Sequence, residues 1–63
     1  MFIEITTRKK EKVSLNISQI VAIHPYKNGS VIFDSAEIDY DTEESYDSVM
    51  GRIYALITHE SDN

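Results

Sequence analysis

Few side chains in this sequence could perform acid–base chemistry. There are two histidines, His24 and His59, and no cysteine, so a thiolate nucleophile and a disulfide are both excluded. We expect His24 to lie diagonally across a hairpin from Asp34, a pairing that can act as a general base. No serine or cysteine nucleophile is implied beside it, so a surface histidine is the simpler interpretation. His59 falls near the end of an expected helix, where its charge suits the helix dipole. The sequence therefore predicts no catalytic residue and no enzymatic activity.

A run of carboxylates is the other candidate for chemistry. Asp39, Asp41, Glu43 and Glu44 resemble a string of calcium ligands. They lack the loop glycine and the terminal bidentate glutamate that an EF-hand requires at fixed spacing. The two glycines of the chain are too far apart to form a loop that cradles phosphate. We therefore expect no metal site and no cofactor.

Positive and negative charges occupy different halves of the chain. Residues 1–33 carry five Lys or Arg against two Asp or Glu, a formal +3, whereas residues 34–63 carry one against nine, a formal −8. Because an acidic chain gains nothing from the release of phosphate counterions, general binding to nucleic acid is disfavoured. The acidic half is either a set of solvent-facing positions or a surface for a basic partner. In the second interpretation the interaction residues are the acids and one exposed aromatic: Asp34, Glu37, Asp39, Asp41, Glu43 and Tyr26.

The basic stretch Arg8, Lys9 and Lys10 has two interpretations. The simpler one is a solvated, lysine-rich hairpin turn. The other is a contact for an anion, for example a signalling nucleotide held by these residues from two chains.

Length limits the architecture. The chain has 63 residues and 7.2 kDa, which allows one domain, expected over residues 1–59 with a frayed tail at 60–63. A chain this short buries only roughly 60% of its unfolded surface, so its core is thin. Its longest apolar stretch, residues 20–23, is far below the roughly 20 residues of a membrane span. No apolar signal-peptide core follows the first residue. We therefore expect a cytoplasmic protein and exclude a large enzyme with a deep pocket.

The hydrophobic period predicts strands followed by one helix. Alternating apolar residues and turn signals place strands at residues 2–7, 12–16, 20–26, 30–35 and 37–41. After residue 41 the period becomes about 3.6, with one face formed by Tyr46, Val49, Met50, Ile53, Leu56 and Ile57. Thr42 or Ser45 can cap this helix, and Gly51 is expected to let it approach the sheet closely. The predicted fold is α+β: an antiparallel sheet of about five short strands, bent enough to resemble an SH3-like half-barrel, with one C-terminal helix.

The hairpin around Asn28 and Gly29 decides which side chains are buried. A three-residue loop pairs Tyr26 with Ser30 and places Val21, Ile23, Val31 and Phe33 together on one face. A two-residue loop at Asn28 and Gly29 inverts this set. We expect the three-residue loop, which leaves three apolar residues on the opposite side of the sheet: Phe2, Ala22 and Ile32. A thin core and an exposed apolar patch favour oligomerisation, so these residues are the predicted homodimer interface, with pairing of edge strands as the alternative.

Several short motifs are similar to a known family. Ile5-Thr6-Thr7-Arg8, Leu15-Asn16 followed by Ile20, Val31-Ile32, and Glu44-Ser45 with Val49 resemble the flagellar FlbD-like family of small proteins. The likeness covers residues 3–57, and its motifs are short and mostly structural. Lys9-Lys10-Glu11 stands where that family has a hairpin glycine, and residues 38–41 stand where it has a valine-rich strand. The resemblance implies a flagellar or regulatory accessory role and transfers no catalytic residue.

The function expected from these features is association with another protein. The leading hypothesis is a small non-catalytic binding module, encoded by a bacteriophage or prophage, that binds a host protein stoichiometrically through the acidic face as an inhibitor or modulator. The alternatives are the FlbD-like accessory role and nucleotide capture in a homodimer groove.

Overall fold

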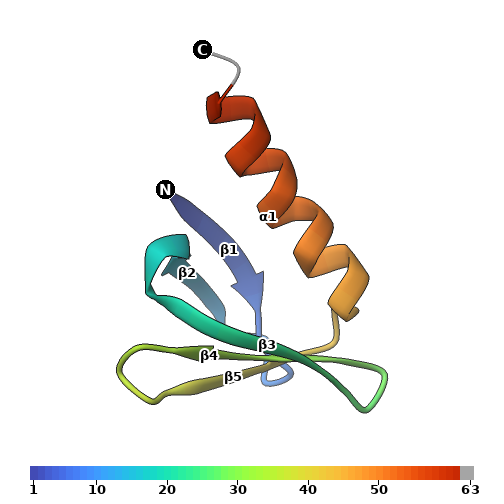
Figure 1. Cartoon of the computed structure of the whole chain (residues 1–63). Helices are drawn as coiled ribbons and strands as arrows, with labels where there is room; N and C mark the ends of the chain where they lie inside the picture. Colours follow the sequence, from blue (N-terminus) through green and yellow to red (C-terminus); the bar gives the residue numbers. More distant parts are fainter. Residues whose placement is uncertain (62–63) are drawn as a thin grey trace.

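Five strands precede a C-terminal helix in the computed structural model, which describes residues 1–61. The elements are shown in Figure 1 and run in this order: β1 (Phe2–Thr6), β2 (Lys12–Asn16), the 3-10 helix η1 (Ile17–Gln19), β3 (Ile20–Tyr26), β4 (Gly29–Asp34), β5 (Asp39–Thr42) and α1 (Tyr46–Ser61). The predicted α+β class, the number of strands and the C-terminal helix are confirmed. Residues 60 and 61 of the expected frayed tail are helical, and residues 62 and 63 lie outside the described residues.

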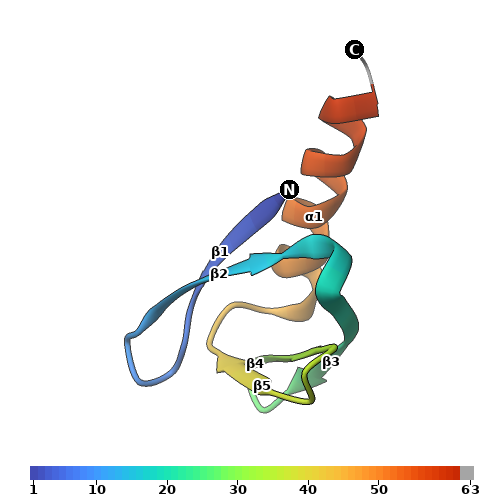
Figure 2. The same cartoon turned by 90° about the vertical axis from the view of Figure 1, so that its left-hand side faces the viewer.

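The strands form two antiparallel sheets instead of one continuous sheet. Strand β1 pairs with β2, and the second sheet has the order β3-β4-β5. The sheets meet at one corner, where Thr7 and Thr42 form an isolated bridge and the Arg8 amide donates to the Asp41 carbonyl at 2.8 Å. Figure 2 shows that they run at a marked angle to each other. The strong bend expected within one sheet is thus achieved by a break between two sheets.

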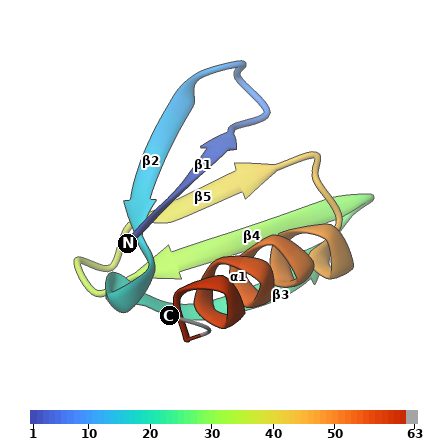
Figure 3. The same cartoon turned by 90° about the horizontal axis from the view of Figure 1, so that it is seen from above.

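The core lies between the two sheets and the helix. Ile3 and Ile5 of β1 point inward because strand side chains alternate, and they are 2% and 1% exposed. They pack with one residue of β2, one of β4 and two of α1. The buried apolar residues are Ile3, Ile5, Leu15, Ile32, Val49 and Ile53. Seen from above in Figure 3, α1 overlaps β3 and β4, and Figure 1 shows that it rises from this sheet at a steep angle. Only six apolar side chains are buried among the described residues, which agrees with the thin core expected from the length.

The expected helix face is buried over only part of its length. Val49 and Ile53 lie in the core, whereas Leu56 and Ile57 are 36% and 45% exposed. The reason is visible in Figure 1, where the C-terminal half of α1 extends past the three-stranded sheet. Gly51 has no heavy atom within 4 Å of the position that a Cβ would take. The expectation that Gly51 admits a close approach to the sheet is therefore wrong.

The hairpin register differs from the predicted one. Its loop has two residues, Lys27 and Asn28, because Tyr26 pairs with Gly29 and not with Ser30. Lys27 takes the left-handed conformation, with a φ of 53°, and no glycine has a positive φ. Gly29 is required for another reason: a Cβ there would collide with the Thr42 carbonyl oxygen and lie 2.9 Å from the Glu43 Cα. Close packing against the following chain, and not turn conformation, selects glycine here.

This register reverses the predicted face of β4, while Ile23 of β3 lies on the core side as expected. Ile23 pairs with Ile32 on the core side, while Phe33 points outward opposite Ala22. A register shift between Ile20 and Ala22 leaves Val21 67% exposed. Because β4 is apolar on both faces, the alternation could not distinguish the registers. Ile32 is 0% exposed, so its assignment to a dimer interface is wrong.

Candidate functional site

The outward face of the three-stranded sheet carries a shallow groove of about 310 Å³. We call it the outer groove and define it by the residues that line it: Tyr26, Val31, Phe33, Asp39 and Asp41. Strand pairing sets its composition, since Phe33 lies opposite Asp39 and Val31 lies opposite Asp41. Each pair therefore places an apolar side chain beside a carboxylate. Tyr26 remains 44% exposed at the hairpin end.

His24 of β3 and Lys27 of the hairpin loop contact two aromatic rings that line the groove. The ring of His24 meets the ring of Phe33 edge-on, with centroids 5.8 Å apart and planes at 81°. The ammonium of Lys27 lies 5.2 Å from the centroid of the Tyr26 ring, within the range of a cation–π interaction. The predicted neighbour of His24 was Asp34, and this is wrong because His24 pairs with Val31 in the observed register. His24 is thus part of an aromatic surface and not of a general-base pair.

Asp34 lies away from the outer groove and stabilises the turn between β4 and β5. Its Oδ1 accepts from the amides of Ala36 and Ile38 at 3.0 and 3.1 Å. The Tyr40 hydroxyl donates to its Oδ2 at 3.1 Å. Desolvation raises the pKa of Tyr40 above its usual value, and the hydrogen bond to Asp34 and its charge raise it further. Glu37 lies in the same turn with a φ of 65° and does not line the groove.

The fold places the basic turn between β1 and β2, which contains Arg8 and Lys10, beside the acidic residues Asp41 and Glu43. Arg8 Nε lies 3.5 Å from Asp41 Oδ1, and Lys10 Nζ donates to Glu43 Oε1 at 3.1 Å. The hydrogen bond and charge of Lys10 lower the pKa of Glu43 below its usual value. The charge separation seen along the sequence is therefore partly cancelled in space. Arg8 and Lys10 each face a carboxylate, so the three residues of the predicted anion contact do not converge on one site.

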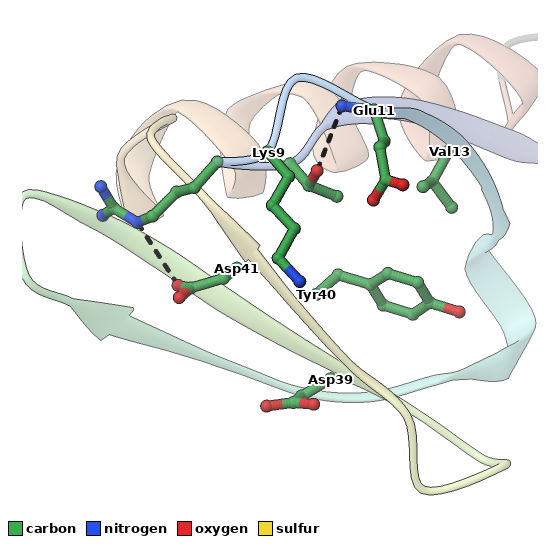
Figure 4. Close-up of a pocket in the computed structure, with 8 residues that line it drawn as sticks. Lys9, Glu11, Val13, Asp39, Tyr40 and Asp41 are labelled. Carbon is green, nitrogen blue, oxygen red and sulfur yellow. Dashed lines mark hydrogen bonds and ion pairs between the residues drawn. The ribbon is translucent and has the colours of Figure 1, made fainter.

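A second hollow, of about 360 Å³, lies between this turn and β5 (Figure 4). Lys9 points into it, and Asp39 and Asp41 border it as well as the outer groove. Asp41 is shared with Arg8, whereas the Asp39 carboxylate has no hydrogen bond or ion pair within residues 1–61. Of the five predicted acidic residues, only Asp39 and Asp41 line the outer groove, and only Asp39 is unpaired there.

A second charged cluster, which the sequence interpretation missed, surrounds the start of α1. The Arg52 guanidinium donates to both carboxylate oxygens of Glu44, and Ser48 Oγ donates to Oε2 at 2.6 Å. The hydrogen bond from Arg52 lowers the pKa of Glu44, while partial burial opposes this effect. Ser45 caps the helix by accepting from the Ser48 amide at 3.1 Å. The four-residue spacing of Glu44, Ser48 and Arg52 is the signal that could have revealed this cluster.

The described residues offer no metal centre. Within residues 1–61 there is no group of three or more His, Asp or Glu side chains placed to hold a metal ion. Over the same range, no helix has the length and apolar character needed to cross a membrane. The outer groove combines apolar side chains with carboxylates on one face of the sheet.

Comparison with protein-family models, curated proteins and solved structures found no match to this chain.

Proposed function

We propose that this protein is a small non-catalytic module that binds another protein stoichiometrically through the outer groove. The observation that carries the proposal is the placement of an unpaired carboxylate, Asp39, beside an outward-facing aromatic surface of Phe33 and Tyr26. Apolar and aromatic side chains that become buried supply most of the binding free energy at an interface. Neighbouring charges select the partner and its orientation. The groove contains both an aromatic surface and an unpaired charge, and none of Phe33, Tyr26 and Asp39 belongs to the hydrophobic core.

The partner that best fits the chain is a host protein with a basic surface. A net charge of −5 steers the protein towards positive surfaces and away from nucleic acid. In this proposal the chain is encoded by a bacteriophage or prophage, acts in the bacterial cytoplasm, and inhibits or modulates the protein that it binds. A flagellar accessory role of the FlbD-like kind rests on the short motifs quoted above. Flagellar genes beside the coding sequence would favour the accessory role, and phage genes would favour the host-protein role.

A homodimer is a compatible arrangement. Phe2 is 62% exposed on the outward side of β1, and Ala22 remains half-buried on the face of β3 opposite Ile23. These are the two residues of the predicted dimer interface that a second chain can reach. Sedimentation equilibrium of the wild type and of Phe2→Ala tests this arrangement. A monomer at millimolar concentration would exclude it without affecting the outer groove.

Capture of a partner from bacterial lysate, compared between matched variants, tests the main proposal. Asp39→Lys reverses the unpaired charge in the groove, and Tyr26→Ala removes its exposed aromatic. Glu37→Lys makes the same charge change in the β4–β5 turn, at a residue that does not line the groove, and serves as the control. We expect Asp39→Lys and Tyr26→Ala to lose the captured protein, while Glu37→Lys retains it. Equal capture by all four proteins, each shown to be folded by circular dichroism, would overturn the proposal.

A further inference from the structure

The outer groove also indicates the chemistry of its partner, and this inference rests on the proposed function. We propose that the groove binds a positively charged protein segment that places an apolar side chain beside an arginine or lysine. We further propose that Arg8 of this chain occupies part of the same site until the partner displaces it.

The side chains that line the groove are arranged in apolar–acidic pairs. Val31 and Phe33 alternate with Asp41 and Asp39 across one pair of strands. Neighbouring strands lie about 4.8 Å apart, so each apolar side chain has a carboxylate one strand spacing away. A segment that inserts an apolar side chain between Val31 and Phe33 therefore brings its adjacent residues over the carboxylates. Positive side chains at those positions complement the groove, and negative ones oppose it.

Two positive groups of this chain already lie at the Tyr26 end of the groove. The ammonium of Lys27 is placed over the Tyr26 ring. The Arg8 guanidinium lies beside Asp41 and donates to the Tyr26 carbonyl oxygen. Asp39, which pairs with Phe33 at the other end of the groove, has no cation from the described residues. The groove therefore attracts cations and retains one carboxylate for a further one.

Arg8 is held at the groove by long contacts. Its Nε lies 3.5 Å from Asp41 Oδ1, and its Nη2 lies 3.4 Å from the Tyr26 oxygen. Neither Arg8 Nε nor Asp41 Oδ1 is accessible to solvent, and neither has a hydrogen-bond partner within residues 1–61. Arg52, by contrast, donates to Glu44 at 2.7 and 2.9 Å. A partner arginine with two short bonds to Asp41 would satisfy the carboxylate better than Arg8 does.

Peptide titration monitored by NMR tests the ligand chemistry. The probe is a five-residue capped peptide with a central leucine flanked by two arginines and terminal glycines, added to the ¹⁵N-labelled full chain. In a control peptide, citrulline replaces both arginines and keeps their shape without the charge. We expect the arginine peptide to shift the amides of Val31, Phe33, Asp39 and Asp41, and the citrulline peptide to lose most of this effect. Equal shifts with both peptides, or shifts confined to other residues, would overturn the proposal.

Two variants with the same net charge test the role of Arg8. Arg8→Gln frees Asp41 in the groove, whereas Lys10→Gln frees Glu43, which does not line it. We expect Arg8→Gln to bind the arginine peptide roughly two- to fivefold more tightly, the range that corresponds to one exposed ion pair. Lys10→Gln should bind it as the wild type does. Equal affinities for both variants, measured on proteins with melting temperatures near that of the wild type, would contradict displacement of Arg8.

The two proposals fail in different ways. If Asp39→Lys abolishes capture of a protein partner but the arginine and citrulline peptides bind alike, the binding function stands and the basic ligand is excluded. If the arginine peptide binds in the groove but Asp39→Lys leaves capture unchanged, the ligand chemistry stands and the proposed function is excluded.

Discussion

The guanidinium of Arg52 donates two hydrogen bonds to the carboxylate of Glu44, from Nη2 to Oε1 at 2.7 Å and from Nε to Oε2 at 2.9 Å. The same Nη2 donates to the Glu4 carbonyl oxygen at 2.9 Å. One side chain of α1 is thereby bonded both to the segment that precedes the helix and to β1. Ser30 of β4 adds a bond to the Glu44 carbonyl oxygen at 2.8 Å. These contacts orient the helix against both sheets where few apolar side chains are available.

Removal of this guanidinium should weaken the whole fold. We expect Arg52→Ala to lower the free energy of unfolding by about 1 kcal/mol, since three charge-assisted bonds at a partly exposed site are lost. Arg52→Lys should recover only part of the loss because an ammonium lacks the planar fork. Urea denaturation monitored by circular dichroism gives the comparison. A midpoint for Arg52→Ala equal to that of the wild type would contradict a role in stability.

Stability should fall in acid partly through Glu44. Its folded-state pKa is lowered by Arg52, so its contribution is present above the ordinary glutamate pKa and is lost as pH falls through the lower, folded value. We expect the urea midpoint of the wild type to drop between about pH 6 and pH 3. Glu44→Gln should be less stable at the upper end of this range and show a shallower drop. Glu11→Gln, which removes a carboxylate with no side-chain partner in the described part of the chain, should keep the wild-type slope.

The two glycines should respond in opposite directions to the same substitution. Gly29→Ala places a Cβ against the Thr42 carbonyl oxygen, and the backbone on both sides must move. We expect a loss of stability of at least about 2 kcal/mol, or failure to fold. Gly51→Ala meets open space in the middle of α1 and should stabilise the protein by roughly 1 kcal/mol. Thermal melts of both variants measure these effects, and a destabilised Gly51→Ala would show that a Cβ at this position does not meet open space.

Ile32 and Phe2, a buried and an exposed residue of the predicted dimer interface, should differ in how much their mutation lowers the stability. Ile32→Ala removes a fully buried side chain and should cost about 2–5 kcal/mol, a large part of the stability of so small a domain. Phe2→Ala alters a side chain that is 62% exposed and should change the stability of the monomer little. Chemical denaturation at low protein concentration compares them. If Ile32→Ala were nearly neutral while Phe2→Ala were costly, the observed hairpin register would be refuted.

Local patterns in the sequence were sufficient to predict the five strands and the helix. The helix follows from the 3.6-residue period and from Ser45, one of two expected caps, which the structure uses. The inward direction of Ile3, Ile5 and Leu15 follows from alternation with polar residues. These signals succeed because each depends on residues a few positions apart. Where both faces of a strand are apolar, as at Val31, Ile32 and Phe33, alternation carries no information about direction.

The sequence alone thus determined the class of fold, the order of the elements, the thin core and the absence of cysteine chemistry. Only the tertiary structure decided which acidic residues share a surface. It assigned Asp34 to a turn, paired Asp41 and Glu43 with the basic residues Arg8 and Lys10, and left Asp39 unpaired beside Phe33. The physical reason is that charges separated by about thirty positions meet only through strand register and sheet packing, and no local pattern in the sequence encodes that distance.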